Sequence, residues 1–174
     1  DPDHETALKI VQALPSAGAD LIELGMPFSD PMADGPVIQS ANDTALAAGV
    51  GLVDVLEIVR TFRMEDGRTP VVLMGYMNPI EAMGMSEFAE AGVDRLIVVD
   101  CSPEESAEFA SCARNVGMSP IFLVAPTSTD ERIAAVAELA AGYVYYVSLK
   151  GTTGAGNLDV ADVHAQVARV RRKI

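Results

Sequence analysis

The chain has 174 residues, of which 49% are hydrophobic and 21% charged, proportions typical of one globular domain over 1–174 with a sizeable core. A formal net charge of −13, from 12 basic and 25 acidic residues, disfavours binding to nucleic acid or anionic membrane surfaces. No apolar run approaches the roughly 18 residues of a membrane span, and no signal peptide is visible. We therefore expect a cytoplasmic protein.

In chain order, the sequence predicts helices and strands that alternate. Asp3 can cap a first helix, which Pro15 should end because proline clashes with the preceding helical turn. Short apolar runs predict five strands, at 21–24, 71–74, 96–99, 121–124 and 143–147. Amphipathic patterns predict further helices at 36–47, 53–62 and 86–91, from a capping box at Ser102 to Glu105, from Ser128 or Thr129, and from Asp159.

Nearly continuous apolar strands that alternate with amphipathic helices predict a parallel sheet in an α/β fold. Strands that start at 71, 96 and 121 repeat about every 25 residues. Periodicity alone does not separate a doubly wound sheet from a barrel, but no GxGxxG motif follows any strand. Polar loops follow all five strands, which favours a (β/α)8 barrel with its site on that rim. Five strands are too few to close such a barrel.

The stretch 21–38 contains the acidic residues most suggestive of a catalytic site. Glu23 interrupts an apolar strand, where burial would raise the pKa of its carboxyl group toward the range useful for proton transfer. Asp34 follows in a loop rich in turn formers and could face Glu23 across a pocket. Two structural interpretations stay open at this point. Glu23 could pair with a basic group, and Asp34 could cap the helix that starts near Pro36.

The motifs ELGMPFSDPMADGP, LIVVD, FLVAPTSTDERI and GYVYYVSLKGTTGAG resemble those of the tryptophan synthase alpha subunit along nearly the whole chain. The resemblance implies an incomplete (β/α)8 TIM barrel holding strands two to six, with the first strand and the last two absent. It also implies a lyase of tryptophan biosynthesis, which cleaves indole-3-glycerol phosphate to indole and glyceraldehyde 3-phosphate. By itself the 174-residue segment, which lacks a starting Met, is expected to be inactive.

The resemblance also implies roles for individual residues. Glu23 matches the general acid/base, and Asp34 matches the carboxylate that meets the indole N–H. Tyr145 matches a substrate-binding tyrosine on the sixth strand of the family, and Asp100 is a candidate for support of the pocket.

The remaining implied roles concern a lid and a partner protein. Thr153 and Gly154 match a mobile lid, whose threonine meets the loop aspartate on closure. Asp30 and Asn78 are expected to contact a tryptophan synthase beta subunit in an alpha2beta2-type complex. The resemblance implies no cofactor in this chain, because pyridoxal phosphate belongs to the beta subunit, and no metal.

Two other functions stay open on the sequence. One is a non-catalytic barrel subunit that binds and activates a partner enzyme, for which intact Glu23 and Asp34 would be unnecessary. The other is a different sugar-phosphate barrel lyase or isomerase, with Lys150 as a Schiff-base lysine. A polar glycine-rich loop around Lys150 is, however, unlike the apolar setting that lowers the pKa of an amine.

The cysteines and histidines do not form a recognisable site in the sequence. Cys101 and Cys112 have no metal-ligand spacing and are expected to be reduced, small apolar residues. His4 and His164 stand alone in helical patterns and are not expected to be ligands or bases.

Overall fold

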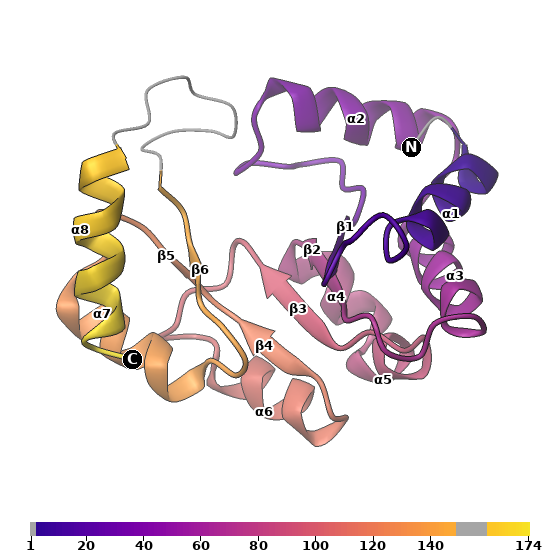
Figure 1. The fold of residues 1–174 in the computed structure, drawn as a ribbon. Coiled ribbons are helices and arrows are strands. Elements are labelled where there is room, and N and C mark those ends of the chain that lie inside the picture. Colours follow the sequence, from indigo (N-terminus) through magenta and orange to yellow (C-terminus); the bar gives the residue numbers. More distant parts are fainter. Residues whose placement is uncertain (1–2, 149–159) are drawn as a thin grey trace.

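The sheet of the protein is built from parallel strands, seen in a computed structural model that describes residues 3–148 and 160–174 (Figure 1). Its strands are β1 (Ile22–Gly25), β2 (Val71–Gly75), β3 (Arg95–Val98), β4 (Ser119–Ile121), β5 (Leu123–Val124) and β6 (Tyr145–Tyr146). All five predicted strands are therefore confirmed in position. Two differ in extent, because the predicted strand 121–124 is split and the last strand is shorter than 143–147.

The strands pair side by side in the order in which they occur in the chain. The order is β1-β2-β3-β4 in one sheet and β5-β6 in the other, and every pair is parallel. The split falls at Phe122, where the pairing partner changes from β3 to β6 and the Phe122 carbonyl accepts the Tyr145 N–H at 2.9 Å. A doubly wound sheet reverses its strand order at a switch point, whereas a (β/α)8 barrel does not. The described strands are therefore an open arc of a (β/α)8 barrel.

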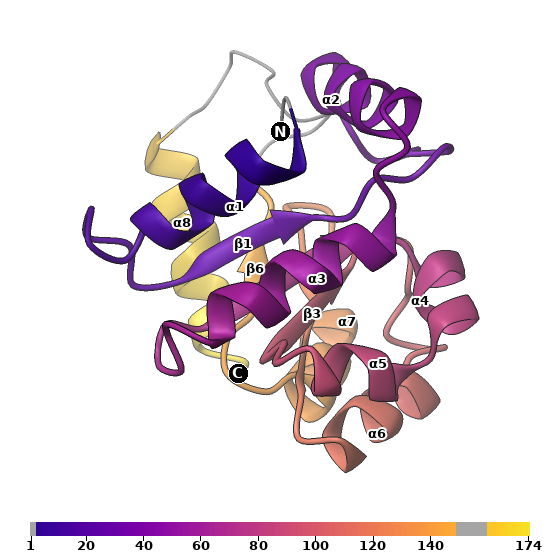
Figure 2. The ribbon, with the colours of Figure 1, turned by 90° about the vertical axis from the view of Figure 1, so that its right-hand side faces the viewer.

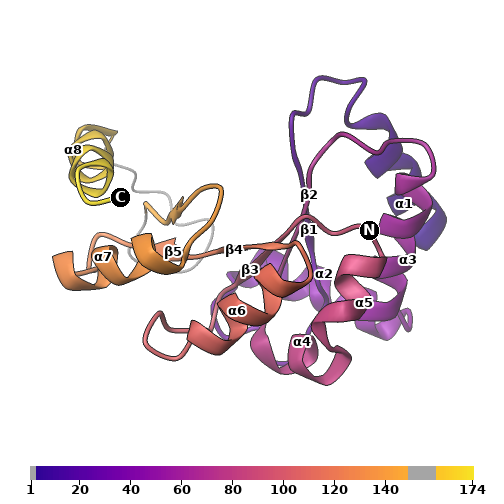
Figure 3. The ribbon, with the colours of Figure 1, turned by 90° about the horizontal axis from the view of Figure 1, so that it is seen from below.

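Most of the helices cover the outer, convex face of this arc. The helices are α1 (His4–Ala13), α2 (Pro36–Ala47), α3 (Leu52–Arg63), α4 (Met77–Met83), α5 (Met85–Glu90), α6 (Ala107–Asn115), α7 (Asp130–Leu139) and α8 (Val160–Arg171). Figure 2 shows α1 and α3 beside β1, with α2 near the end toward which β1 runs. Figure 3 shows α3, α5, α6 and α7 following one side of the arc. None of the described helices is long and apolar enough to cross a membrane.

Caps at several helix starts agree with the sequence. The Asp3 carboxylate accepts the N–H of Thr6 at 2.7 Å, and the Thr129 hydroxyl accepts the N–H of Arg132 at 3.2 Å. Each bond satisfies a backbone donor that a helix start leaves free. The predicted Asp159 cap lies outside the described residues.

One predicted helix start is wrong and one helix was not predicted. The Ser102 hydroxyl donates to the Glu105 carboxylate at 3.1 Å, and the backbone there forms a turn, so α6 begins only at Ala107. The two residues of the capping-box pattern therefore bond to each other through their side chains, and neither caps a helical N–H. Helix α4 was not predicted because Asn78-Pro79, which is a common turn signal, lies in its first turn, where proline is tolerated.

The core has two layers, one on each face of the sheet. The larger cluster packs the outer face of the strands against the helices and includes Phe62, Leu73 and Phe88, all at most 1% exposed. The smaller cluster lies on the inner face and centres on Val72, Ile97 and Ile121. Because side chains alternate between faces of a strand, these two clusters assign each strand residue to one side.

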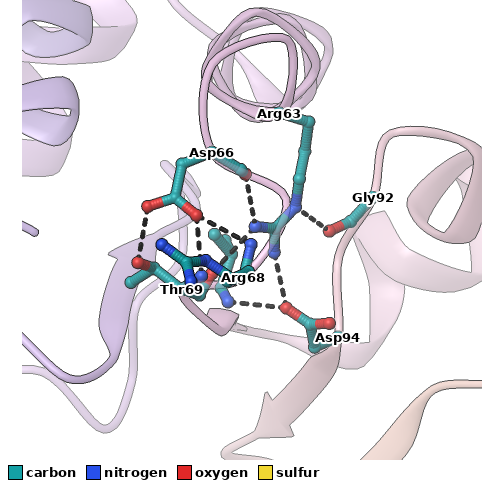
Figure 4. A network of polar contacts seen from close by, with 7 residues as sticks. Arg63, Asp66, Arg68, Thr69, Gly92 and Asp94 are labelled. Carbon is teal, nitrogen blue, oxygen red and sulfur yellow. Dashed lines mark hydrogen bonds and ion pairs between the residues drawn. The ribbon is translucent and has the colours of Figure 1, made fainter.

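A polar network around Arg63 holds together the N-terminal ends of the strands, where β2 and β3 begin (Figure 4). The Arg63 guanidinium contacts the Asp94 carboxylate at 2.5 Å and donates to the carbonyls of Gly92 and Thr69, each at 2.8 Å. The Asp66 carboxylate accepts hydrogen bonds from the hydroxyl and N–H of Thr69 and from the N–H of Arg68. These bonds stabilise the ionised carboxylate and lower the pKa of Asp66 to about 2. Residues at this face of a barrel usually serve stability.

Candidate active site

Glu23 lies on the inner face of β1. Its neighbours Ile22 and Leu24 belong to the outer cluster, whereas Leu21 belongs to the inner one, so alternation places Glu23 inside the arc. Burial by surrounding protein raises the pKa of Glu23, as the sequence predicted for a carboxyl group in an apolar strand. The side chain is nevertheless exposed, because β1 is the outermost of the paired strands described and only β2 flanks it.

A cavity of about 320 Å³ opens beside Glu23, between β1 and the helices α1, α2 and α3. Its wall is mostly apolar, with Ala7, Val11, Ile38 and Ala45 among the lining residues. Polar groups on the wall come from Glu23 itself and from four further residues, Asp3, His4, Asn42 and Thr44. Val11, Val55 and Ile58 on the wall belong to the outer cluster, so the cavity opens between β1 and the helices rather than inside the arc.

Asp34 is held at the C-terminal ends of the strands by Tyr76, which follows β2. The Tyr76 hydroxyl donates to the Asp34 carboxylate at 3.1 Å, and the Asn42 amide lies 3.5 Å from the same oxygen. Asn42 also lines the cavity beside Glu23, whereas Asp34 does not. The residue that caps α2 is Gly35, without any side-chain cap bond, so Asp34 is not the helix cap that the sequence left open.

Tyr76 is a candidate site residue that the sequence did not indicate. Its hydroxyl accepts the Ala33 N–H at 3.0 Å, and its ring stacks on Phe28 with centroids 5.1 Å apart, so it binds the acidic loop at three points. Burial raises the pKa of Tyr76, which keeps its hydroxyl protonated as a donor to Asp34. Its position directly after β2 was the available signal, because barrel sites gather residues at strand ends.

The residues predicted to face a partner lie on the surface near this loop. Asp30 is exposed and accepts the Ser29 hydroxyl at 2.6 Å, and Asn78 is exposed on α4. Met32 and Val37 stand nearby in the sequence, each 78% exposed. Helix α2 has no buried residue, so this side of the molecule has apolar surface that the described chain does not cover.

The other predicted site residues are in separate places. Tyr145 lies on β6 and packs against the inner cluster, on the face that carries Glu23. Asp100 accepts the Met77 N–H at 2.8 Å and so caps α4, a structural contact that the sequence did not indicate. Thr153, Gly154 and Lys150 lie outside the described residues.

The cysteines and histidines lie apart from one another, and two of them differ from the expectation. Both cysteines are free, but Cys112 is exposed rather than packed in the core. His4, set aside on sequence, lines the cavity beside Glu23, whereas His164 is exposed on α8. Within residues 3–148 and 160–174, no group of His, Cys, Asp or Glu could hold a metal ion.

Glu23 and Asp34 are two carboxyl groups in unlike environments, one on the inner face of β1 and the other at the C-terminal ends of the strands. Glu23 has a raised pKa, which suits a group that gives and takes protons, whereas Asp34 is fixed by hydrogen bonds in an orientation suited to holding charge. Environments that differ in this way separate a proton-transfer role from an electrostatic one.

Known proteins match the chain over its full length. Residues 1–174 match the family model described as tryptophan synthase alpha chain. The tryptophan synthase alpha chain of Burkholderia thailandensis is 58% identical over an alignment that covers 100% of this chain and 66% of that relative. That of Paraburkholderia phymatum is 57% identical with the same coverage. The chain therefore spans about two thirds of the length of these relatives.

Solved structures give the same result for the fold. The crystal structure of tryptophan synthase subunit alpha from Legionella pneumophila superposes with a TM-score of 0.89 at 42% identity, covering 99% of this chain and 65% of that chain. A structure of the tryptophan synthase a2b2 complex from Pyrococcus furiosus superposes with a TM-score of 0.88 at 39% identity, covering 99% of this chain and 70% of that chain. From the family match and these identities, we conclude that the chain belongs to the tryptophan synthase alpha chain family.

Proposed function

We propose that this chain, as part of the longer protein, cleaves indole-3-glycerol phosphate to indole and glyceraldehyde 3-phosphate. The observation that carries the proposal is Glu23, a carboxyl group of raised pKa on the inner face of β1, in a chain that also holds a second carboxyl group, Asp34, in place at the C-terminal ends of the strands. A flat apolar ring such as indole suits the apolar inner face around Val72 and Ile97, and the two acids suit its charge changes.

The reaction breaks the bond between indole C3 and the glycerol side chain. In our proposal Glu23 delivers a proton to C3 and takes the proton of the adjacent glycerol hydroxyl, whose carbon becomes the aldehyde. Positive charge develops on the indole nitrogen as C3 is protonated, and the Asp34 carboxylate stabilises it by accepting the indole N–H. Tyr76 holds Asp34 for this task through the 3.1 Å hydrogen bond.

Substrate contacts by Tyr145, Asp100, Thr153 and Gly154 remain part of the proposal. A substrate contact by Tyr145 is supported by its position against the inner cluster. Asp100 accepts the Met77 N–H at the start of α4, which leaves it less free to bind substrate. In the longer protein we expect the barrel to be closed by strands before β1 and after β6. Loops after the last strands of such barrels frequently bind phosphate.

We also propose that the chain binds a tryptophan synthase beta subunit in an alpha2beta2-type complex. The Pyrococcus furiosus relative occurs in a complex of that kind. Support from this chain comes from the exposed surface around Asp30, Asn78, Met32 and Val37, because large exposed apolar side chains in one region favour a protein interface. The cofactor pyridoxal phosphate would belong to the partner, and a biosynthetic enzyme of this kind would be cytoplasmic.

The decisive experiment measures indole release by the full-length protein from indole-3-glycerol phosphate, with and without the beta subunit. We expect steady indole formation without added metal or cofactor, and a faster rate in the complex. Binding of the beta subunit without any indole formation would instead favour the non-catalytic role. Cleavage or isomerisation of a different sugar phosphate, with no indole formed from indole-3-glycerol phosphate, would favour another sugar-phosphate lyase or isomerase.

A further inference from the structure

The described strands contain a single acidic and a single basic side chain, and both face the inside of the arc. The acid is Glu23 of β1 and the base is Arg95 of β3. Leu96 belongs to the outer cluster and Ile97 to the inner one, so alternation places Arg95 on the same face as Glu23.

Glu23 and Arg95 also share one row across the sheet. Glu23 pairs with Val72, and Val72 pairs with Arg95, so the two charged residues are separated by one strand. Neighbouring strands lie about 4.8 Å apart, which puts the two backbones about 10 Å apart. A glutamate and an arginine that point into the same interior can approach each other over that separation.

Arg95 is held against the strand that leads into β6 rather than against an acid. Its guanidinium carbon lies 5.7 Å from the centroid of the Tyr143 ring, a cation–π contact. Gly142 has a φ of +91°, and a Cβ atom there would lie 3.0 Å from Arg95 Nε, so the missing side chain leaves room for the guanidinium. Within residues 3–148 and 160–174, no hydrogen bond or ion pair engages the Arg95 side chain.

Tyr143 lies within the electrostatic reach of both charged residues. Burial raises the pKa of Tyr143, the Glu23 carboxylate raises it further, and the Arg95 guanidinium opposes both. Other ionisable groups around Glu23 are Asp3 and His4 of α1 on the cavity wall and Tyr145 on the inner face. The parts of α2 and α3 that line the cavity are uncharged.

We propose that Arg95 is a positioning residue for Glu23: held in place by Tyr143 on the same row of the inner face, its cation favours the ionised carboxylate inside the barrel. Burial alone favours the protonated form of Glu23, whereas a fixed cation on the same inner face favours its ionised form. A group that must both give and take a proton benefits when neither form is strongly preferred. As a statement about catalysis, this inference rests on the proposed function, but as a statement about Glu23 ionisation it does not.

The test is a titration of the Glu23 carboxyl carbon by NMR in the full-length protein, without substrate. Arg95→Met and Arg95→Gln remove the charge at similar side-chain length, and Arg95→Lys retains the charge and the cation–π contact. We expect the Glu23 titration midpoint to move to higher pH in both neutral variants and to stay near that of the unaltered protein in Arg95→Lys. An unchanged midpoint in the neutral variants, or an equal shift in all three, overturns the inference.

A second readout separates this inference from the proposed function. In the indole assay, the limb of the pH–rate profile set by Glu23 should move in the same direction as the titration midpoint, and Arg95→Lys should restore it. A protein that forms no indole but shows the titration shift refutes the proposed function and leaves the role of Arg95 standing. If the neutral Arg95 variants lose activity while the titration midpoint of Glu23 stays unchanged, the proposed function stands and the role of Arg95 is refuted.

Discussion

The proposed chemistry depends most on Glu23, because this residue is both the general acid and the general base of the reaction. Glu23→Gln keeps the shape of the side chain but removes its acid–base function. A general acid/base contributes about 10²–10⁴-fold to rate, and service in two transfers places Glu23 at the upper end. Indole formation by the full-length variant measures the loss, and full activity would refute the mechanism.

The same variant makes a prediction about stability as a function of pH. Since the folded-state pKa of Glu23 is raised, the folded protein binds this proton more tightly than the unfolded chain, and ionisation lowers the free energy of unfolding as pH rises above the unfolded value. Glu23→Gln should therefore unfold at a slightly higher temperature at neutral pH. This advantage should disappear below about pH 4, near the pKa of an unfolded glutamate. A melting temperature lowered at neutral pH would contradict the assignment.

Asp34 is predicted to act through its charge rather than as a helix cap. Asp34→Asn keeps a hydrogen-bond acceptor for the Tyr76 hydroxyl but loses the negative charge, and removal of one preorganised contact costs on the order of 3–4 kcal/mol in the transition state. Asp34→Glu retains the charge on a longer arm and should keep measurable activity. The assay is again indole formation, with melting temperature as control. Near-normal activity in Asp34→Asn would leave Asp34 without a catalytic role.

Among the elements, the Arg63 network fixes how α3, α5 and the start of β3 meet, and Gly92 is its most sensitive position. Gly92 has a φ of +86°, and a Cβ atom there would lie 2.7 Å from Arg63 Cγ. Gly92→Ala combines backbone strain, about 1–3 kcal/mol for a non-glycine residue in that region, with displacement of Arg63. We expect a free energy of unfolding lowered by more than the strain alone.

Gly117 provides the matched control for this substitution. It also follows a helix and has a φ of +81°, but no atom lies within 4 Å of its missing Cβ. Gly117→Ala should therefore cost the backbone strain without the clash. Chemical denaturation of both variants gives the comparison, and equal losses would show that contact with Arg63 adds nothing.

At the scale of the whole molecule, the sheet should be most stable at its centre. Strands β2 and β3 are paired on both sides and carry fully buried residues such as Leu73 and Leu96, whereas the β5–β6 ladder joins only two residue pairs. Local opening requires less energy where few buried contacts are lost. Native-state hydrogen exchange should be slowest in β2 and β3 and faster in β6. Equal protection of all strands would contradict this view.

Most of the elements and their order could be predicted from the sequence, as could the two candidate acids, and the polar loops after the strands favoured a barrel. Apolar strands and amphipathic helices can be predicted because their patterns depend on residues close together in the chain. The same holds for the helix caps at Asp3 and Thr129, whose side chains bond to an N–H three residues later. Glu23 stood out for the same reason, as an acid inside an apolar strand. The Ser102 pattern misled because a hydroxyl can choose a nearby side chain over a backbone N–H.

Contacts between residues far apart in the sequence became visible only in the folded molecule. The Tyr76 hydroxyl reaches Asp34 across 42 positions of sequence, and Arg95 shares a row with Glu23 through Val72 because parallel strands were brought into register. The change of partner at Phe122 depends likewise on where β3 and β6 lie. No local pattern encodes such contacts, since they arise from the packing of whole strands against one another and against the helices outside them.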